Sequence, residues 1–482
     1  MLPQTVPAQA GATSADLLPV SVSGVSSARV PHPYGAAAPR VNALPTKSGN
    51  TEIDAVVHGA TQWWHDSNNV VGTAGATGMS NARHELTFSF MAVANSSAVS
   101  DNRGFQAMNA ASKQAVRDAL AYAATTANLT FHEVDSGGNI QFGTNNQQGK
   151  SGGYAYVPNT RDADVASVYM ANDAYNQATT DWSPGTQGWA ALVHEIGHAL
   201  GLKHPGAYNA GGGTTPGPYL PKTEDTTRYS VMSYNDPSDS RVAVGADIGG
   251  GRTSLSSHSV QARGYQMVDL EALQYMYGKS QSSSETEAQS YAFSSDDADN
   301  GEFLKTISNS NAESEIDASG QTRANVIDLR SGHFSSIGLR DPYAALPTSV
   351  NTAAKWANAV HSNVKPTYTG ANNLAIANGS HIDRAKGGHG ADTIVGNDDA
   401  TNTINSGEGN DTIYLGKANS TVEAGAGTDT VCLTKLKTKW TVAFNAETGT
   451  YTCRNGAITS VVHGAESIKG WNGSTLKISA LA

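Results

Sequence analysis

The chain has very little cysteine. Its 482 residues include only two, Cys432 and Cys453, both near the C-terminus. Two thiols so placed exclude a cysteine-based metal site, a disulfide framework and a cysteine nucleophile. They flank an expected hairpin, so the sequence leaves open either a disulfide formed in an oxidising compartment or two separate thiols.

Charged residues and long apolar runs are also scarce. Charged side chains make up 15% of the chain, and the net charge is −11. This acidic balance argues against nucleic acid as a partner, because a phosphate backbone attracts basic surfaces. No apolar run reaches transmembrane length. The N-terminus lacks the basic and apolar segments of a secretory signal peptide, so any secretion is expected to depend on a different export signal.

Glycine, in contrast, is abundant, with 50 residues. Together with 38% hydrophobic residues, this composition is typical of a turn-rich globular protein that is long enough for two or three domains. Residues 1–50 are rich in Ala, Pro, Ser and Val without periodicity. They predict a leader or propeptide that is mostly disordered.

The most specific pattern is H-E-x-x-H-x-x-G-x-x-H, which begins at His194. On a helix, His194 and His198 share a face and can direct their ring nitrogens at one ion. Gly201 can adopt a positive φ, which lets the chain leave the helix and bring His204 to the same point. Glu195 lies beside the first ligand, where it can handle the proton of a zinc-bound water. The pattern is typical of zinc hydrolases.

The alternative interpretation of this motif is an amphipathic helix with surface histidines. It explains two histidines poorly and the third not at all. The residues before the motif, Trp189–Leu192, are good helix formers. A buried apolar stripe is predicted on the same helix, formed by Leu192, Ile196, Ala199 and Leu200.

Around the motif, expected helices and strands alternate along the chain. Helices are predicted over residues 53–64, 112–128 and 267–277, with Ser112 as an N-cap and Gly278 at the last C-terminus. Strands are predicted over residues 84–90, 129–134, 139–142 and 153–157. Pro158 ends the last strand, which is typical of a strand at a sheet edge. This order indicates a sheet packed with helices.

A second pattern is the nine-residue repeat G-G-x-G-x-D-x-U-x, which begins at Gly387 and has near copies beginning at Ser406 and Ala424. Such repeats form a parallel β-roll around calcium. The glycines let each turn present carbonyl oxygens, and the aspartate adds an anionic oxygen. The candidate calcium ligands therefore come from three turns: Gly387, Gly388, Gly390, Asp392, Gly407, Gly409, Asp411, Gly425, Gly427 and Asp429. The alternative is a set of glycine-rich turns without metal.

Degenerate copies between these repeats predict an asymmetric roll. One full turn takes two repeats, so Asp392, Asp411 and Asp429 should line one side. The intervening copies offer Asn402 and Ser420 at the same position, and these are weaker calcium ligands. We therefore expect about two calcium ions on one side of the roll and few or none on the other.

Downstream of the histidines lies Ser230-Val231-Met232-Ser233-Tyr234. With the long zinc motif and the following repeats, the chain resembles the serralysin family of bacterial secreted metalloendopeptidases, in the metzincin clan. The likeness covers about residues 50–432. It implies that Met232 is the floor of the site and that Tyr234 is a zinc ligand that switches to stabilising the oxyanion. The alternatives are a core methionine and a surface tyrosine.

The resemblance also implies an architecture and a place where substrate binds. Substrate backbone would pair with the edge strand by β-augmentation at Tyr154, Ala155 and Tyr156. The chain would be multidomain: an α+β metzincin catalytic domain with a mixed twisted sheet, helices and zinc in a cleft, then an all-β domain of parallel β-roll and sandwich. The expected segments are a leader or propeptide (1–50), the zinc metalloprotease domain (51–278), a linker and β-sandwich part (279–386), the calcium-binding roll (387–432) and a C-terminal hairpin module with an export signal (433–482).

The resemblance implies a secreted zinc-dependent endopeptidase that hydrolyses extracellular proteins. It carries one catalytic zinc ion and several structural calcium ions. It implies export by a type I secretion apparatus through an uncleaved C-terminal signal, a zymogen activated by loss of its leader, an inhibitor protein as a further partner, and a monomer. The alternative is a calcium-repeat adhesin or surface protein whose protease domain is vestigial or narrow in specificity. Intact zinc ligands favour the enzyme.

Overall fold

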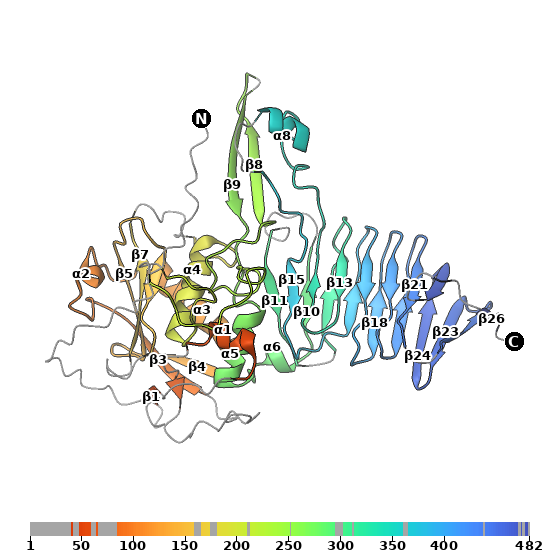
Figure 1. Ribbon diagram of the computed structural model, residues 1–482, viewed down its shortest axis with the longest axis horizontal. Helices are drawn as coiled ribbons and strands as arrows, with labels where there is room; N and C mark the ends of the chain where they lie inside the picture. The colour runs from red at the N-terminus through yellow and green to blue at the C-terminus, as the bar shows by residue number, and fades with distance from the viewer. Residues whose placement is uncertain are drawn as a thin grey trace. The chain divides into compact units, whose positions relative to one another are not determined.

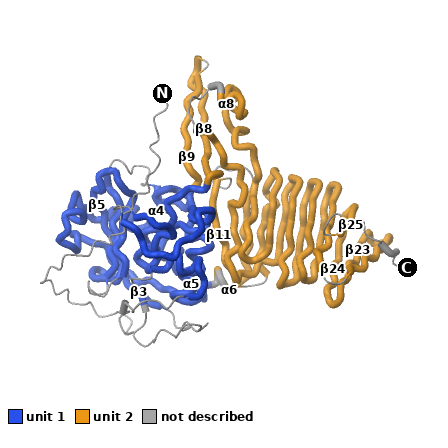
Figure 2. The backbone as a smooth tube through the Cα atoms, in the orientation of Figure 1, with its two compact units in different colours: residues 1, 3–237, 261–282 blue, residues 2, 238–260, 283–482 orange. Residues whose placement is uncertain are grey.

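A computed structural model gives the arrangement of the chain (Figure 1). It describes residues 40–41, 48–58, 64–65, 84–158, 165–173, 181–209, 213–250, 252–294, 302–310, 313–359, 365–436, 439–470, 474 and 478–480. Most of the expected leader lies outside these residues. Two compact units are coloured in Figure 2: residues 3–237 with 261–282, and residues 238–260 with 283–482.

The first unit contains a five-stranded mixed sheet in the order β4-β3-β5-β7-β6. Its strands are β3 (His84–Phe90), β4 (Leu129–Glu133), β5 (Ile140–Asn145), β6 (Gly153–Ala155) and β7 (Ala166–Ala171). All neighbours are parallel except β6, which is antiparallel to β7. The mixed sheet and the edge position of the strand at residues 153–157 are therefore confirmed.

Helices and one further strand pair complete this unit. They are α1 (Thr51–Val56), α2 (Val99–Asn102), α3 (Ala110–Thr126), α4 (Gln187–Ala199) and α5 (Met267–Tyr277), with β1 (Arg40–Val41) paired to β2 (Trp64–His65). The predicted helix over 267–277 is confirmed, and Gly278 follows it with φ +82°.

Two helix predictions need correction. The helix expected over 53–64 ends at Val56, and its expected last residue, Trp64, lies in strand β2. Ser112 is not an N-cap, because α3 begins at Ala110 and the Asn109 side chain accepts the Ser112 backbone N–H. Asparagine caps helices as well as serine does, so residue type alone did not distinguish the two positions.

Helix α4 lies in the core of the first unit. Leu192, Ile196, Ala199 and Leu200, the predicted apolar stripe, are all buried, with exposed fractions of 1% or less. The neighbouring residues are buried too, from Trp189 to Ala199 except for the half-buried Ala191. The helix is therefore enclosed on nearly all sides and cannot be a surface helix carrying exposed histidines.

The second unit is built around two parallel sheets whose strands alternate along the chain. One sheet has the order β13-β17-β19-β21-β25 and the other β10-β12-β16-β18-β20-β24-β23-β22-β26. The strands of the first are β13 (Val326–Asp328), β17 (Thr393–Val395), β19 (Thr412–Tyr414), β21 (Thr430–Leu433) and β25 (Ser467–Gly470). Its stacked core side chains are in register: Ile327, Ile394, Ile413, Val431 and Ile468.

The second of these sheets continues into an antiparallel end. Its strands are β10 (Ser290–Ala292), β12 (Glu315–Asp317), β16 (Arg384–Lys386), β18 (Asn402–Asn405), β20 (Ser420–Glu423), β22 (Thr441–Asn445), β23 (Thr450–Asn455), β24 (Ile458–His463) and β26 (Ile478–Ala480). The expected tail hairpin is confirmed, because β22 pairs antiparallel with β23.

The roll begins earlier than the repeats suggest. Strands β10, β12 and β13 already join the parallel sheets, although they lie in the segment 279–386 that was expected to hold a linker and sandwich. A small sheet of β11 (Lys305–Ile307), β14 (Phe334–Ser335) and β15 (Leu374–Ile376) lies in the same stretch, after the short helix α6 (Ser283–Thr286).

A long hairpin was not anticipated by the sequence. Strands β8 (Arg241–Asp247) and β9 (Thr253–Ser259) pair antiparallel and belong to the second unit, although they precede α5 in the chain. Helix α8 (Ala353–Ala359) contributes Trp356 to a small core with Ala243 of the hairpin.

Both cysteines are buried and free. Cys432 lies in β21 and Cys453 in β23, which belong to different sheets, so the disulfide left open by the sequence is absent. No helix among the described residues is long and apolar enough to cross a membrane.

Candidate metal centre

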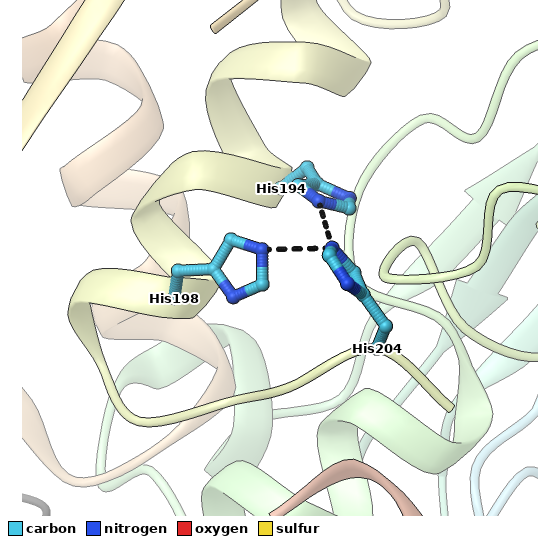
Figure 3. Close-up of side chains that lie close together, drawn as sticks. All are labelled: His194, His198 and His204. Atoms are coloured by element: carbon cyan, nitrogen blue, oxygen red, sulfur yellow. Dashed lines mark hydrogen bonds between the residues drawn. The ribbon is translucent and has the colours of Figure 1, made fainter. Parts of the chain in front are cut away.

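Three histidine rings converge at the end of helix α4 (Figure 3). His194 and His198 lie one turn apart on the helix, which ends at Ala199. Gly201 has φ +99°, a backbone conformation that favours glycine, and there the chain turns back. His204 then places its Nε2 atom 3.2 Å from Nε2 of His194 and 3.0 Å from Nε2 of His198. The predicted geometry of the motif is thus present.

The Nδ1 atoms of His194 and His198 show which tautomer each of these two rings adopts. Nδ1 of His194 lies 2.9 Å from the Val231 carbonyl oxygen, and Nδ1 of His198 lies 2.9 Å from the Leu202 carbonyl oxygen. Because a carbonyl only accepts, each Nδ1 carries the proton and each Nε2 keeps a lone pair. Burial lowers the pKa of His194 to about 4, so its ring is neutral at neutral pH.

These features fit a zinc ion. Neutral imidazole nitrogens with backbone carbonyls behind them are the usual donors of a three-histidine catalytic zinc site, which keeps a fourth position open. The Nε2 lone pairs of His194 and His198 both face Nε2 of His204, at 3.2 and 3.0 Å, so a single cation can be reached by all three rings. Among the described residues, His194, His198 and His204 form the one group of three or more His, Cys, Asp or Glu side chains whose ligand atoms all lie within 4.8 Å of one another.

Glu195 lies beside this cluster and is almost completely buried, with 1% of its surface exposed. Its Oε2 atom has no hydrogen-bond partner among the described residues. Burial raises the pKa of this carboxyl group well above its ordinary value. Edge strand β6 passes directly over it: a Cβ atom on Gly153 would lie 2.8 Å from Cγ of Glu195. The carboxylate therefore lies between the histidines and the sheet edge.

Met232 packs against the same helix. A Cβ atom added to Gly197 would lie 2.7 Å from the Met232 sulfur, so the glycine inside the motif makes room for this side chain. Met232 is fully buried. The structure thus places it against α4 between the first two histidines in sequence.

Tyr234 stands next to the histidine rings. Its ring centroid lies 4.3 Å from that of His204 and 5.8 Å from that of His194. Burial, and then the nearby Glu195 carboxylate, raise the pKa of its hydroxyl, so it is protonated and able to donate a hydrogen bond. Tyr234 is therefore part of the site rather than an isolated surface tyrosine.

Sequence reasoning missed a carboxylate that organises the chain around Met232. Asp269, in the first turn of α5, accepts the Ser230 hydroxyl at 2.6 Å and the Val231 N–H at 2.7 Å. It also accepts the Gln266 N–H at 2.9 Å in a capping box. The Val231 carbonyl contacts Nδ1 of His194, so Asp269 anchors the residue whose carbonyl orients the first ligand. The capping-box spacing could have identified Asp269 as a cap, but nothing in the sequence connects it to residue 231.

A second missed contact supports Tyr234. The Tyr208 hydroxyl donates to the Asp225 carboxylate at 2.5 Å and accepts the Tyr234 backbone N–H at 3.2 Å. The Tyr208 ring stacks on Tyr234 with centroids 4.9 Å apart and lies beside His204 at 5.8 Å. Tyr208 therefore contacts both Tyr234 and His204 and helps to hold them in place. No spacing pattern in the sequence indicated this role.

The tyrosine side chains of the predicted substrate strand bond to another part of the chain. The hydroxyls of Tyr154 and Tyr156 both donate to buried Asp101, at 2.7 Å and 3.0 Å. Tyr154 is 6% exposed and Ala155 is fully buried, so neither offers a side chain to a substrate. Tyr156 is partly exposed. The backbone of Gly153–Ala155 therefore remains the predicted place of substrate contact.

The repeat aspartates form a ladder along one side of the roll. The Asp392 N–H donates to Asp411 and the Asp411 N–H to Asp429, each at 2.8 Å, and the Asp429 N–H donates to Glu466 at 2.6 Å. The second oxygens of Asp411 and Asp429 are buried and have no hydrogen-bond partner among the described residues. Burial raises the pKa of Asp411 to about 6.

The repeat glycines are required by close stacking of these turns. A Cβ atom on Gly427, at φ +146°, would lie 1.7 Å from the Gly409 carbonyl oxygen, and one on Gly409 would lie 2.3 Å from that of Gly390. Each turn therefore brings its carbonyl oxygens against the next turn, where no side chain can intervene.

The opposite side of the roll is closed by amide side chains. Asn402 accepts the Asn397 N–H at 2.8 Å and donates to the Asn397 carbonyl at 3.1 Å. The Asn397 side chain donates to the Ile382 carbonyl at 2.8 Å and accepts the N–H groups of Asp399 and Ala400. Hydrogen bonds within the chain thus satisfy the turn at residues 397–402. In register with Asn402, the hydroxyls of Ser420 and Ser460 and one oxygen of Asp383 are buried without a hydrogen-bond partner among the described residues.

Comparison with known proteins relates the chain to metallopeptidases. It is 30% identical over 341 residues to metallopeptidase AprA of Pseudomonas marginalis, covering 67% of this chain and 62% of the relative. It is 30% identical over 344 residues to a serralysin of Proteus mirabilis, covering 66% and 60%. The same identity holds over 324 residues for serralysin A of Dickeya chrysanthemi, covering 62% and 59%. No family model matches.

The chain spans about 60% of the length of these curated relatives. Among solved structures, that of myroilysin is 14% identical and covers 50% of this chain and 100% of that one, at a TM-score of 0.24. In sequence, the chain is similar to serralysin-type metalloproteases over about two thirds of its length.

Replacing Asp269 by alanine should weaken metal binding. The change leaves the Ser230, Val231 and Gln266 donors without their acceptor, at about 1–3 kcal/mol for each unsatisfied group. Loss of such an outer contact typically costs about 10–100-fold in metal affinity. Zinc affinity by competition with a chromogenic chelator, and thermal unfolding, measure both effects. The matched control is Asp236→Ala at an exposed position. Unchanged zinc affinity in a folded Asp269→Ala protein would contradict this account.

Proposed function

We propose that the chain is a zinc-dependent endopeptidase that hydrolyses peptide bonds in extracellular proteins. The observation that supports this proposal most strongly is the convergence of three imidazole rings beside the buried carboxylate of Glu195: Nε2 of His204 lies 3.2 Å from that of His194 and 3.0 Å from that of His198. The relatives named metallopeptidase and serralysin support the same activity. A vestigial protease domain in an adhesin would not need to keep every ligand and the carboxylate in one arrangement.

The three histidines and Glu195 have different roles in the proposed reaction. Zinc, when bound to the three histidines, supplies Lewis-acid chemistry that acidifies water and polarises the substrate carbonyl. Glu195 takes the proton of the attacking water and delivers it to the leaving amine. Burial raises the pKa of this carboxyl group, so it holds the transferred proton more readily than an exposed glutamate would.

Tyr234 donates a hydrogen bond to the oxyanion that forms from the carbonyl oxygen. A protonated phenol fixed near the reacting centre stabilises developing negative charge without reorganising. Contacts with Tyr208 hold the Tyr234 ring and backbone in place. A direct bond from Tyr234 to the zinc ion in the resting enzyme, as the resemblance implies, is part of the same proposal.

The substrate backbone pairs with the free edge of β6. Gly152 and Tyr156 both bond to β7 through their backbones, so the alternating groups of Gly153 and Ala155 face the other edge. Those groups lie beside Glu195, because Gly153 packs against its side chain. A peptide added there as a strand would present its carbonyl to the histidines.

We further propose that calcium binds mainly along the side of the roll lined by Asp392, Asp411 and Asp429, with few or no ions on the other side. The unpartnered buried oxygens of Asp411 and Asp429 are hard oxygen donors of the type calcium prefers. On the other side, Asn402 bonds within its own turn and Ser420 follows it in register, so Asp383 is the one carboxylate in that row of described residues. This asymmetry supports the lopsided roll expected from the repeats.

An extracellular location follows from the same chemistry in this proposal. Calcium sites built from few charges need about 10⁻⁴–10⁻³ M calcium, the range of extracellular modules. Export through a type I apparatus with a C-terminal signal, activation by loss of a leader, control by an inhibitor protein and a monomeric state complete the proposal, all by resemblance. The last residues, 481–482, lie outside the described part of the chain.

Replacing Glu195 by alanine should abolish proteolysis while zinc remains bound. General acid–base groups contribute about 10²–10⁴-fold to the rate, so casein hydrolysis should fall by at least 100-fold. Zinc content by mass spectrometry should stay at that of the unchanged protein, because the three ligands are intact. Cleavage of casein at the original rate by this variant, with calcium present, would overturn the peptidase assignment.

Calcium should raise the unfolding temperature of the second unit, and the response should depend on Asp411. A ligand at 100 times its dissociation constant adds about 2.7 kcal/mol to the free energy of unfolding. Asp411→Asn keeps an acceptor for Asp392 but removes the charge, and should at least halve the calcium-induced shift measured by calorimetry. The matched variant on the other side, Asn402→Ala, should lower stability with the calcium shift intact. Equal loss of the shift in both variants would contradict the asymmetry.

A further inference from the structure

The lysine inside the metal motif is buried in an unusual way. Lys203, which directly precedes His204, is 1% exposed. Its ammonium group donates to the carbonyl oxygen of Ala55 and, at 3.0 Å, to that of Pro218. A buried ammonium is costly unless it is hydrogen-bonded, so these acceptors are needed for the chain to fold this way. Ala55 lies in the last turn of α1, where carbonyls attract a cation.

Backbone contacts join the same two segments. The Lys203 N–H donates to the Val56 carbonyl at 2.7 Å, and the His58 N–H donates to the Gly201 carbonyl at 3.1 Å. Val57 and Leu202 form an antiparallel bridge between these contacts. The stretch that carries the chain from the end of α4 to the third ligand is therefore paired along its length with residues 56–58.

The N-terminal partner has its own fixed beginning. The Asn50 side chain caps α1 by accepting the Glu52 N–H at 2.9 Å. The Ser48 backbone N–H donates to the Asp54 carboxylate at 2.8 Å. Ala55 and Val56 are fully buried. The contacts that cap and anchor α1 thus begin at Ser48, which lies inside the segment 1–50 that the sequence predicted as a mostly disordered leader. Strand β1 (Arg40–Val41) lies in the same segment and pairs with β2.

We propose that residues 48–58 are a permanent part of the metal site, fixed to the His204 loop by Lys203, and that any maturation cleavage must fall before Ser48. Lys203 is a positioning residue: its ammonium group holds the carbonyl end of α1 against residues 201–203, and this contact sets where His204 places Nε2. The inference rests on the proposed function only in taking zinc as the ion at the site.

The first test is Lys203→Met in the full chain, with Lys203→Arg to restore a cation and Lys222→Met as an exposed control. Lys203→Met should weaken zinc binding about 10–100-fold, the usual effect of losing an outer contact. It should also shift the visible absorption bands of the cobalt-substituted protein, because the third ligand moves. Lys203→Arg should recover at least part of the affinity, and Lys222→Met should bind as the unchanged protein does.

Zinc affinity and a cobalt spectrum unchanged in folded Lys203→Met would overturn the proposal. Neither readout requires peptidase activity, so a failure of the casein assay alone would remove the proposed function and leave this inference standing.

The second test covers a Lys203→Met protein that does not fold. N-terminal sequencing of the zinc-loaded species produced from the unchanged full chain should find a first residue no later than Ser48. A stable zinc-bound species that begins after His58 would overturn the proposal.

Discussion

The convergence of three imidazole rings on one point is the constraint on which the first unit depends: Nε2 of His204 lies 3.2 Å from that of His194 and 3.0 Å from that of His198. A metal ion needs its ligands in fixed orientations, so the surrounding chain must hold each ring in place. The Val231 and Leu202 carbonyls do this for the two rings on α4. Behind Val231 stands Asp269, and the third ring follows a stretch paired with residues 56–58. Elements that are far apart in the sequence therefore all contribute to positioning the three histidine rings.

The second unit also brings candidate metal-binding atoms together, and here they are carboxylate oxygens. Stacked turns bring buried carboxylates close together on one side, and the second oxygens of Asp411 and Asp429 find no donor among the described residues. On the other side, Asn397 and Asn402 supply both donors and acceptors and close one turn within the chain. The two sides therefore differ in how many carboxylates they offer to a cation. The difference comes from neutral Asn402 and Ser420 on one side and the charged Asp411 and Asp429 on the other.

Much of the site could be predicted because its residues are close in sequence. The positions from His194 to His204 depend on helix periodicity and one glycine, which are local properties. The aspartate ladder followed from the repeat in the same way. Asp269, Tyr208 and Lys203 could not be found, because their roles depend on tertiary contacts with distant residues. The early start of the roll at β10 was missed for a related reason: its first strands lack the glycine repeat, and only their pairing with later strands reveals them.

The central claim is that these histidines hold zinc through their Nε2 atoms. The most direct measurement is an anomalous difference map collected on both sides of the zinc absorption edge from crystals of the full chain grown with zinc. We expect a single strong peak in the first unit, about 2.0–2.1 Å from Nε2 of His194, His198 and His204, with the Nδ1 contacts retained. A fully ordered site with no peak among these three atoms, or a zinc ion bound elsewhere in that unit, would contradict the account.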